Sequence, residues 1–146
     1  MLNSTKLQNL NLIPKQKLAL ALGNYGCYFA CLCRIAEKIT DTGIDLIESF
    51  YECKNKNWIE SDCYVKNPEK IVEFLTGKKT SVLKIYNTFY IPAENEYIIG
   101  CYENLNGGHF VLLSNSDKSV EYDPLENSNT VRTGKLKSLR IIKIEN

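Results

Sequence analysis

The sequence predicts an α+β fold in which helices come first and an antiparallel sheet follows. Residues 27–77 carry apolar side chains at helical spacing, whereas from residue 80 onward β-branched and aromatic runs are separated by turn residues. Helices in the first half and strands in the second indicate an antiparallel sheet, because parallel strands need crossover helices between them. A length of 146 residues suits a single domain, residues 1–146.

The first helix is expected from Cys27 to Thr40. The apolar residues that recur every four positions on one face are Cys27, Cys31, Ile35 and Ile39. The preceding residues 23–26 are expected to form a tight turn, because they include two glycines. Residues 1–12 show no clear periodicity and are expected to form an N-terminal arm.

Two further helices and five strands are expected. One helix runs from Thr42, its N-cap, to about Cys53; the other has Asn67 as its cap, Pro68 in its first position and Gly77 at its end. Turn residues separate the later apolar runs. The strands are expected at Thr80–Tyr86, Glu96–Tyr102, His109–Ser114, Ser119–Asp123 and Leu139–Ile144.

Charge and hydropathy exclude several classes of function. The 18 Lys and Arg residues against 17 Asp and Glu residues give no field that would attract a nucleic acid or an anionic membrane. The densest basic stretch, Arg132–Lys143, lacks interleaved aromatic residues and is expected to be a solvated strand face and loop. No apolar run suits a membrane span or a signal peptide, so a cytoplasmic protein is expected.

The cysteines and the single histidine limit the chemistry. One histidine excludes zinc sites that need two or more imidazoles. Six cysteines without a secretory segment indicate free thiols. A metal cluster of Cys27, Cys31 and Cys33 departs from the spacing of common thiolate sites, so no metal and no organic cofactor is expected. The cysteines interpreted as core or half-buried residues are Cys31, Cys33, Cys53, Cys63 and Cys101.

Cys27 is the cysteine with the sequence context of a nucleophile. It lies in the first turn of the expected helix, where unpaired backbone N–H groups and the positive end of the helix dipole favour thiolate over thiol. The same N–H groups can hold a negatively charged oxygen. The alternative interpretation is a buried thiol without a chemical role.

His109 and Asp123 are candidates for the base and the acid that orients it. His109 follows two glycines, which leave room for a substrate beside the imidazole. In an antiparallel hairpin centred near Ser116, Asp123 returns to the beginning of the strand that carries His109, where a carboxylate can fix the ring and its tautomer. The alternatives are a histidine bonded to a loop carbonyl and an aspartate that only forms a turn.

This order of residues resembles that of the papain-like peptidases, in particular the double-glycine branch that processes bacteriocins. The residues with counterparts there are Gly26, Cys27, Gly108, His109, Asp123 and Pro124. The whole chain is also similar to a family of short, functionally uncharacterised proteins encoded by phages and phage-like plasmids. That match includes Tyr25-Gly26-Cys27, Asp62-Cys63-Tyr64-Val65 and the His-Phe strand with its Asp-Pro.

The resemblance implies a papain-like domain, with N-terminal helices packed on a C-terminal sheet. It implies a cysteine peptidase, or a related thiol hydrolase or acyl-transferase, that uses Cys27, His109 and Asp123 on a peptide or protein substrate. The position of the oxyanion-hole glutamine of such enzymes is Ala21 here, which leaves Asn24 or Gln16 as candidates. The competing hypothesis is a papain-like binding protein of phage or plasmid origin that acts on a host protein without turnover.

Overall fold

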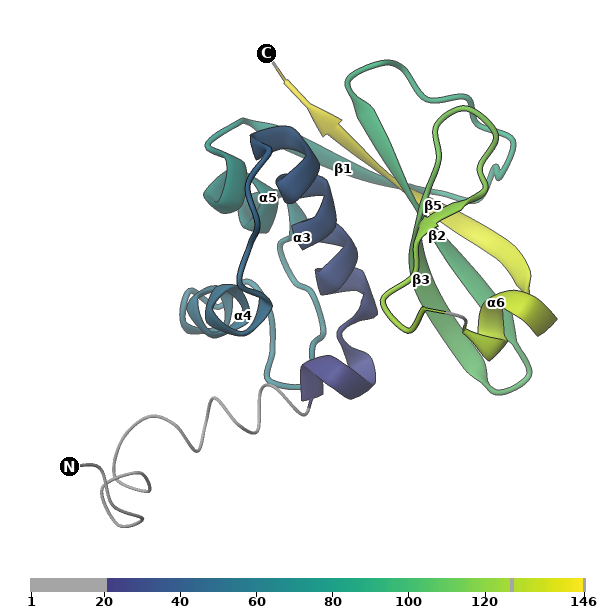
Figure 1. Cartoon of the computed structure of the whole chain (residues 1–146), viewed down its shortest axis with the longest axis horizontal. Helices are drawn as coiled ribbons and strands as arrows, with labels where there is room; N and C mark the ends of the chain where they lie inside the picture. The colour runs from purple at the N-terminus through teal and green to yellow at the C-terminus, as the bar shows by residue number, and fades with distance from the viewer. Residues whose placement is uncertain (1–20, 127, 146) are drawn as a thin grey trace, which may run out of the picture.

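The structure is a computed structural model and describes residues 21–126 and 128–145 (Figure 1). It confirms the α+β fold, because helices pack against a sheet of antiparallel strands. The helices are α3 (Cys27–Thr40), α4 (Leu46–Asn55), α5 (Pro68–Thr76) and α6 (Asn129–Thr133). The strands are β1 (Thr80–Ile85), β2 (Glu96–Asn104), β3 (Gly107–Leu113), β4 (Val120–Tyr122) and β5 (Lys135–Ile144). The expected arm, residues 1–12, and Gln16 lie outside the described residues.

The segment before α3 differs from the prediction. Residues 21–25 are helical and not a tight turn, and the N–H of Gly26 donates to the carbonyl oxygen of Leu22 at 2.9 Å. Gly26 has a φ of −89°, which any residue can adopt. Its need for glycine is steric, because an added Cβ would lie 2.5 Å from that carbonyl oxygen. The chain therefore bends into α3 where two helical segments approach each other closely.

The helix α4 begins later than predicted. Thr42 is not its N-cap, because α3 ends at Thr40 and Asp41 then adopts a left-handed conformation with φ 53°. The chain uses the residues after Asp41 to turn between the two helices. The N-cap of α4 is Asp45, whose carboxylate accepts a hydrogen bond from the N–H of Glu48 at 2.9 Å. α5 begins and ends as predicted, although the side chain of its N-cap residue makes no capping hydrogen bond.

The sheet has the strand order β1-β5-β2-β3-β4, so the last strand of the sequence lies inside the sheet. All five predicted strands form, although β5 begins at Lys135 rather than Leu139. Cys101 pairs with Ser138 and Tyr102 with Leu136, so β5 carries an extra residue at this point. This bulge interrupts the alternation of apolar and polar residues that would have revealed the beginning of the strand.

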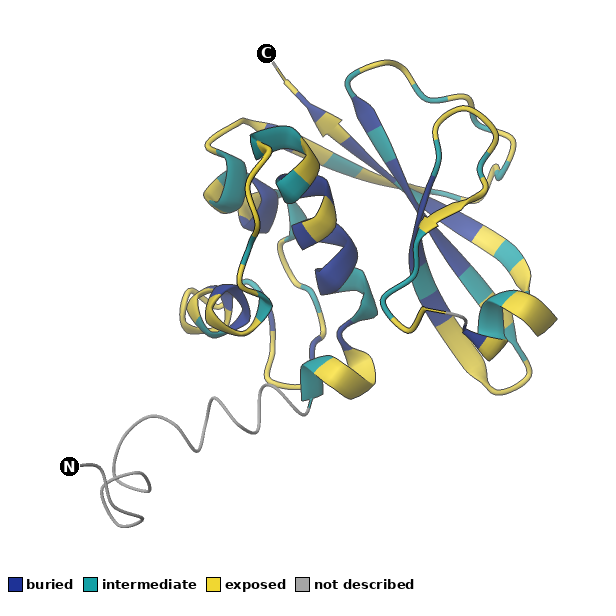
Figure 2. Cartoon of the chain, in the orientation of Figure 1, coloured by how far each residue is buried: buried dark blue, intermediate teal, exposed yellow. Residues whose placement is uncertain are grey.

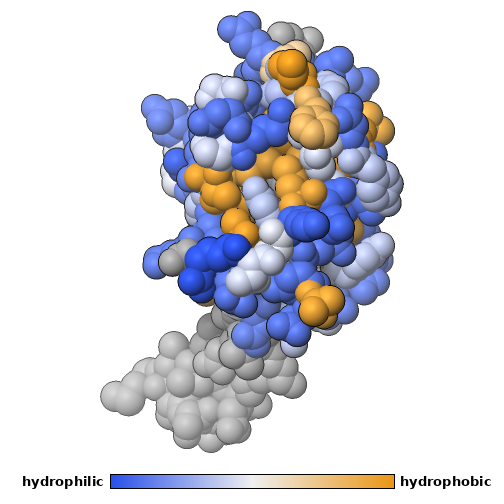
Figure 3. All heavy atoms as spheres, turned by 90° about the vertical axis from the view of Figure 1, so that its right-hand side faces the viewer, coloured by the Kyte–Doolittle hydropathy of each residue, from blue (hydrophilic) through white to orange (hydrophobic). Residues whose placement is uncertain are grey.

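The sheet has an apolar cluster on each face. On one face, α3, α4 and α5 share a core with Ile99, Leu112 and Ile142, and Figure 2 shows the buried residues of α3 and the strands. The other face carries a second cluster around Val111, to which Val131 of the unpredicted α6 contributes. Figure 3 looks onto this side and shows apolar side chains framed by polar ones. Within the described residues, no helix has the length and apolar character to cross a membrane.

Candidate active site

Three separate elements bring the predicted triad together. Cys27 is the first residue of α3, His109 lies in β3, and Asp123 follows β4. His109 Nε2 lies 2.7 Å from Asp123 Oδ1, and the imidazole and the Cys27 thiol share a hydrogen bond. Because Asp123 takes Nε2, the ring nitrogen left for the sulfur is Nδ1. The imidazole is nearly buried, with 3% of His109 exposed.

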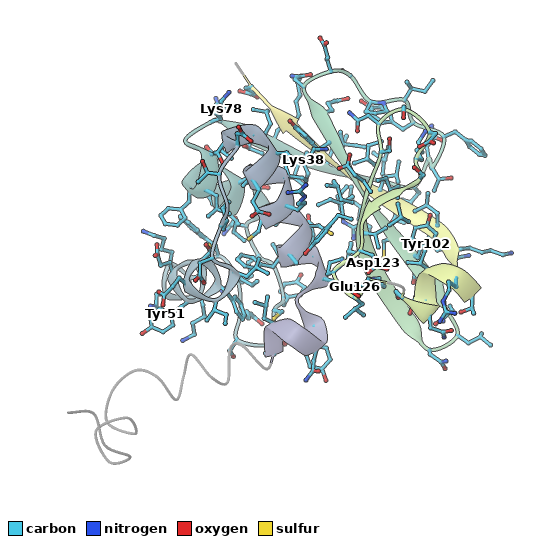
Figure 4. All side chains as sticks on the ribbon, viewed as in Figure 1. Lys38, Tyr51, Lys78, Tyr102, Asp123 and Glu126 are labelled. Carbon is cyan, nitrogen blue, oxygen red and sulfur yellow. The ribbon has the colours of Figure 1, made fainter. Side chains whose placement is uncertain are left out.

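The hairpin of β3 and β4 explains the position of Asp123. The two strands are antiparallel, with Leu112 opposite Tyr122, so the next residue returns toward the beginning of β3 (Figure 4). Two backbone N–H groups hold the carboxylate there: that of Leu125 donates to Oδ1 at 2.9 Å and that of Ser128 to Oδ2 at 3.0 Å. The loop that carries Asp123 therefore fixes the carboxylate in the position from which it orients the imidazole.

The edge of β3 holds the sulfur in place. β4 pairs with β3 only at Leu112 and Leu113, so it leaves Phe110 without a strand neighbour on that side. The N–H of Phe110 donates to the Cys27 sulfur, and its carbonyl accepts the Cys31 thiol, with an Sγ–O distance of 3.7 Å. Two cysteines one helical turn apart thus occupy the hydrogen-bonding groups of one residue. Sequence reasoning missed the role of Phe110, although the spacing of the two cysteines was visible.

Electrostatics favour an ionised Cys27. Burial acts to raise the pKa of its thiol. Stronger effects lower this pKa below its usual value: the hydrogen bond with His109, the N–H of Phe110, the charge of His109 and the N–H of Tyr28. Burial acts to lower the pKa of His109, but its hydrogen bonds and charge interactions with Cys27 and Asp123 raise it above its usual value. A lowered pKa of the thiol and a raised pKa of the imidazole are the shifts expected for a thiolate paired with an imidazolium.

The other cysteines remain thiols. Burial raises the pKa of each, to about 12 for Cys53 and about 11 for Cys63. The pKa of Cys31, Cys33 and Cys101 is raised as well, again mainly by burial. Of the six cysteines, Cys27 is thus the one whose pKa is lowered, and all six are free. In the described part of the chain, no group of three or more His, Cys, Asp and Glu residues is placed to bind a metal ion.

A cavity of about 790 Å³ opens at the triad. Cys27, His109 and Asn24 line it, with walls from the beginning of α4 and the loop after β4. Asn24 is exposed, so its amide is free of the core and can turn toward a substrate oxygen. Ala21 packs against the main core instead, and Gln16 lies outside the described residues.

The basic stretch Arg132–Lys143 differs from the prediction at one residue. Most of its cations are exposed, but Arg140 is half-buried and lies on the face of β5 that meets the helices. Its guanidinium carbon is 5.1 Å from the ring centre of Phe110 and 6.0 Å from that of Tyr28. The sequence could have indicated that Arg140 faces the helices, because it lies two residues before a buried isoleucine and residues two apart in a strand share a face.

Fold and site together define an α+β protein in which a cysteine at a helix N-terminus meets a histidine from a sheet and an aspartate from the loop that follows it. The chain belongs to the family described as "Protein of unknown function, DUF261", whose profile matches residues 10–144. Comparison with curated proteins and with solved structures gives no significant match.

Proposed function

We propose that this chain is a cysteine peptidase, or a related thiol hydrolase or acyl-transferase, with a papain-like site. The observation that carries the proposal is the hydrogen-bonded series from Cys27 through His109 to Asp123. A nucleophile, a base and a group that orients the base are the parts that thiol acyl transfer requires. The cavity beside them gives a peptide access to the sulfur.

The proposed reaction follows from these positions. The Cys27 thiolate attacks the carbonyl carbon of a peptide or amide bond, and the Cys27 N–H and the Asn24 amide hold the oxyanion. As the C–N bond breaks, the His109 imidazolium gives its proton to the leaving amine, and a thioester remains on Cys27. His109 then takes a proton from water, whose oxygen attacks the thioester and releases the acid and the thiolate. An amine in place of water gives acyl transfer.

We place this chemistry in the cytoplasm. All six cysteines are free, and thiols persist in a reducing compartment. The reaction also needs Cys27 as a reduced thiolate, and an oxidising compartment favours the oxidation of thiolates.

Mass spectrometry of a peptide library tests the proposal. The library and an activated peptide ester are incubated with wild type, Cys27→Ser and Asn24→Ala. We expect new peptide termini and an acyl adduct on Cys27 with wild type, and neither with Cys27→Ser. Asn24→Ala should be slower by about 10² to 10³, the usual effect of removing one oxyanion donor. If wild type gives neither products nor an adduct, the chain is better explained as a binding protein.

A further inference from the structure

A second cavity, of about 510 Å³, also reaches Cys27. Its walls include residues of α3, α5, β1 and β5, and we call it the Arg140 cavity after one of the residues that line it. Tyr25, Cys27 and Phe110 line both this cavity and the one that holds His109. A substrate bound at the sulfur can therefore extend into the Arg140 cavity.

Arg140 is held in this cavity by stacking, and it forms no ion pair with a carboxylate of residues 21–126 or 128–145. Its guanidinium lies near the rings of Tyr28 and Phe110, which are stacked on each other with centroids 4.7 Å apart. Its Nη1 donates to Ser138 Oγ at 2.9 Å. A guanidinium has five N–H donors, so this arrangement fixes the group and leaves most of its donors free.

Lys84 places a second cation in the same cavity. It pairs with Arg140 across the antiparallel strands β1 and β5, so the two side chains are neighbours on one face of the sheet. Its Nζ lies 5.1 Å from the ring centre of Tyr86. Within residues 21–126 and 128–145, neither cation forms an ion pair with a carboxylate. Among the described residues that line the cavity, Glu69 carries the one carboxylate, so the side chains of Arg140 and Lys84 face one acidic side chain and the Cys27 sulfur.

We propose that the Arg140 cavity binds a carboxylate of the substrate through Arg140 and Lys84. Like charges side by side on a sheet are unfavourable, and an anion between them removes that repulsion. The planar fork of an arginine fits a carboxylate with two parallel hydrogen bonds. The inference rests on the proposed function and adds its substrate class: peptides with an acidic side chain or a free C-terminus close to the bond that reacts.

Two pairs of alkylating peptides test this inference without a known substrate. Bromoacetyl-Gly-Gly with a free C-terminus is compared with its amide, and bromoacetyl-Glu amide with bromoacetyl-Gln amide. Each pair differs by one carboxylate, in the first case terminal and in the second on a side chain, so the two sources are distinguished. The measurement is the rate of Cys27 alkylation, followed by mass spectrometry of the peptide that contains Cys27.

We expect one acid or both to react about three to ten times faster than the matched neutral reagent, as for a half-exposed charged hydrogen bond. Without such a site a thiolate repels an anionic reagent, so the ratio would be one or less. Arg140→Gln and Lys84→Gln should each lower the ratio toward one, and Glu69→Gln should raise it. Lys79→Gln, which removes the same charge from an exposed site outside the cavity, should leave it unchanged.

The neutral reagents keep the two proposals separate. Their rate and its pH dependence report the activation of Cys27, and circular dichroism of Arg140→Gln shows whether the variant is folded. Lys84 is exposed, so Lys84→Gln tests the site even where Arg140→Gln unfolds. A ratio at or below one in wild type for both pairs, or a ratio that the Lys84 and Arg140 substitutions do not change, overturns the carboxylate site. If the acidic reagents still react faster, but the Cys27 alkylation rate depends on pH as it does for an ordinary thiol, the triad is overturned and the carboxylate site is not.

Discussion

The reactivity of Cys27 depends on its neighbours more than on its place in the helix. Burial alone would raise the pKa of the thiol, and hydrogen bonds from an imidazole and two backbone N–H groups reverse that direction. The sequence indicated the helix N-terminus, the histidine and the aspartate, because each has a local signal. It did not indicate Phe110, whose N–H is available only because β4 is short.

Asp123→Asn tests the role of the carboxylate at the same scale. Burial raises the pKa of Asp123, but hydrogen bonds with His109, Ser128 and Leu125 and the charge of His109 lower it below its usual value. A lowered pKa in the folded state contributes stability above the pKa of the unfolded chain, near 4, which is lost as the pH falls through the folded pKa. We expect the substitution to lower the free energy of unfolding by about 1–3 kcal/mol at pH 7.

Urea unfolding of wild type and Asp123→Asn between pH 2 and pH 7 measures this difference. It should shrink below about pH 4, where wild type also loses the negative charge. A difference that stays the same at every pH would show that the ionised carboxylate does not stabilise the fold.

At the scale of elements, the bend before α3 is set by steric contact. Gly26→Ala places a Cβ against the carbonyl of Leu22, so we expect the substitution to lower the free energy of unfolding by about 1–3 kcal/mol. Gly23 is the matched control, because it lies in helical residues 21–25 with nothing within 4 Å of an added Cβ. Gly23→Ala should be neutral or stabilise the protein by up to about 1 kcal/mol. Thermal unfolding of both variants tests this, and equal effects would contradict it.

The beginning of α4 gives a second test of local structure. Asp45 accepts the N–H of Glu48, so Asp45→Ala should lower the free energy of unfolding by about 1 kcal/mol. Thr42 donates its hydroxyl to the carbonyl of Thr40 and caps no helix, so Thr42→Ala should change it by less than about 0.5 kcal/mol. Chemical denaturation compares the two variants. A larger loss for Thr42→Ala would support a helix that begins at residue 43.

These elements show how far sequence reasoning reaches. The ends of α3 and α5 were predictable from local signals: a glycine before the first, and a proline and a glycine around the second. The N-cap of α4 was not, because Thr42 and Asp45 are both good caps and the end of α3 decides between them. α6 spans five residues, Asn129–Thr133, which is too short to show a helical period.

At the scale of the whole molecule, the site depends on how the two layers meet. The helix layer supplies Cys27, the sheet supplies His109 and the loop after β4 supplies Asp123, so the triad exists only when α3 is docked on β3. Lys38 of α3 and Glu121 of β4 add an ion pair of 2.6 Å across the same boundary. The strand order was not predictable from local signals, because it requires knowing that β5 lies inside the sheet.

The rate of Cys27 alkylation by iodoacetamide across pH, in wild type and in His109→Ala, tests the central claim most directly. We predict that the rate of wild type rises with a midpoint below about pH 8.5, the value of an ordinary thiol. In His109→Ala the midpoint should move above that of wild type. Burial raises the pKa of Cys27, and the hydrogen bond and charge of His109 that lower this pKa are then absent. A midpoint near pH 8.5 in both proteins would contradict the account, because Cys27 would then be an ordinary thiol that does not interact with His109.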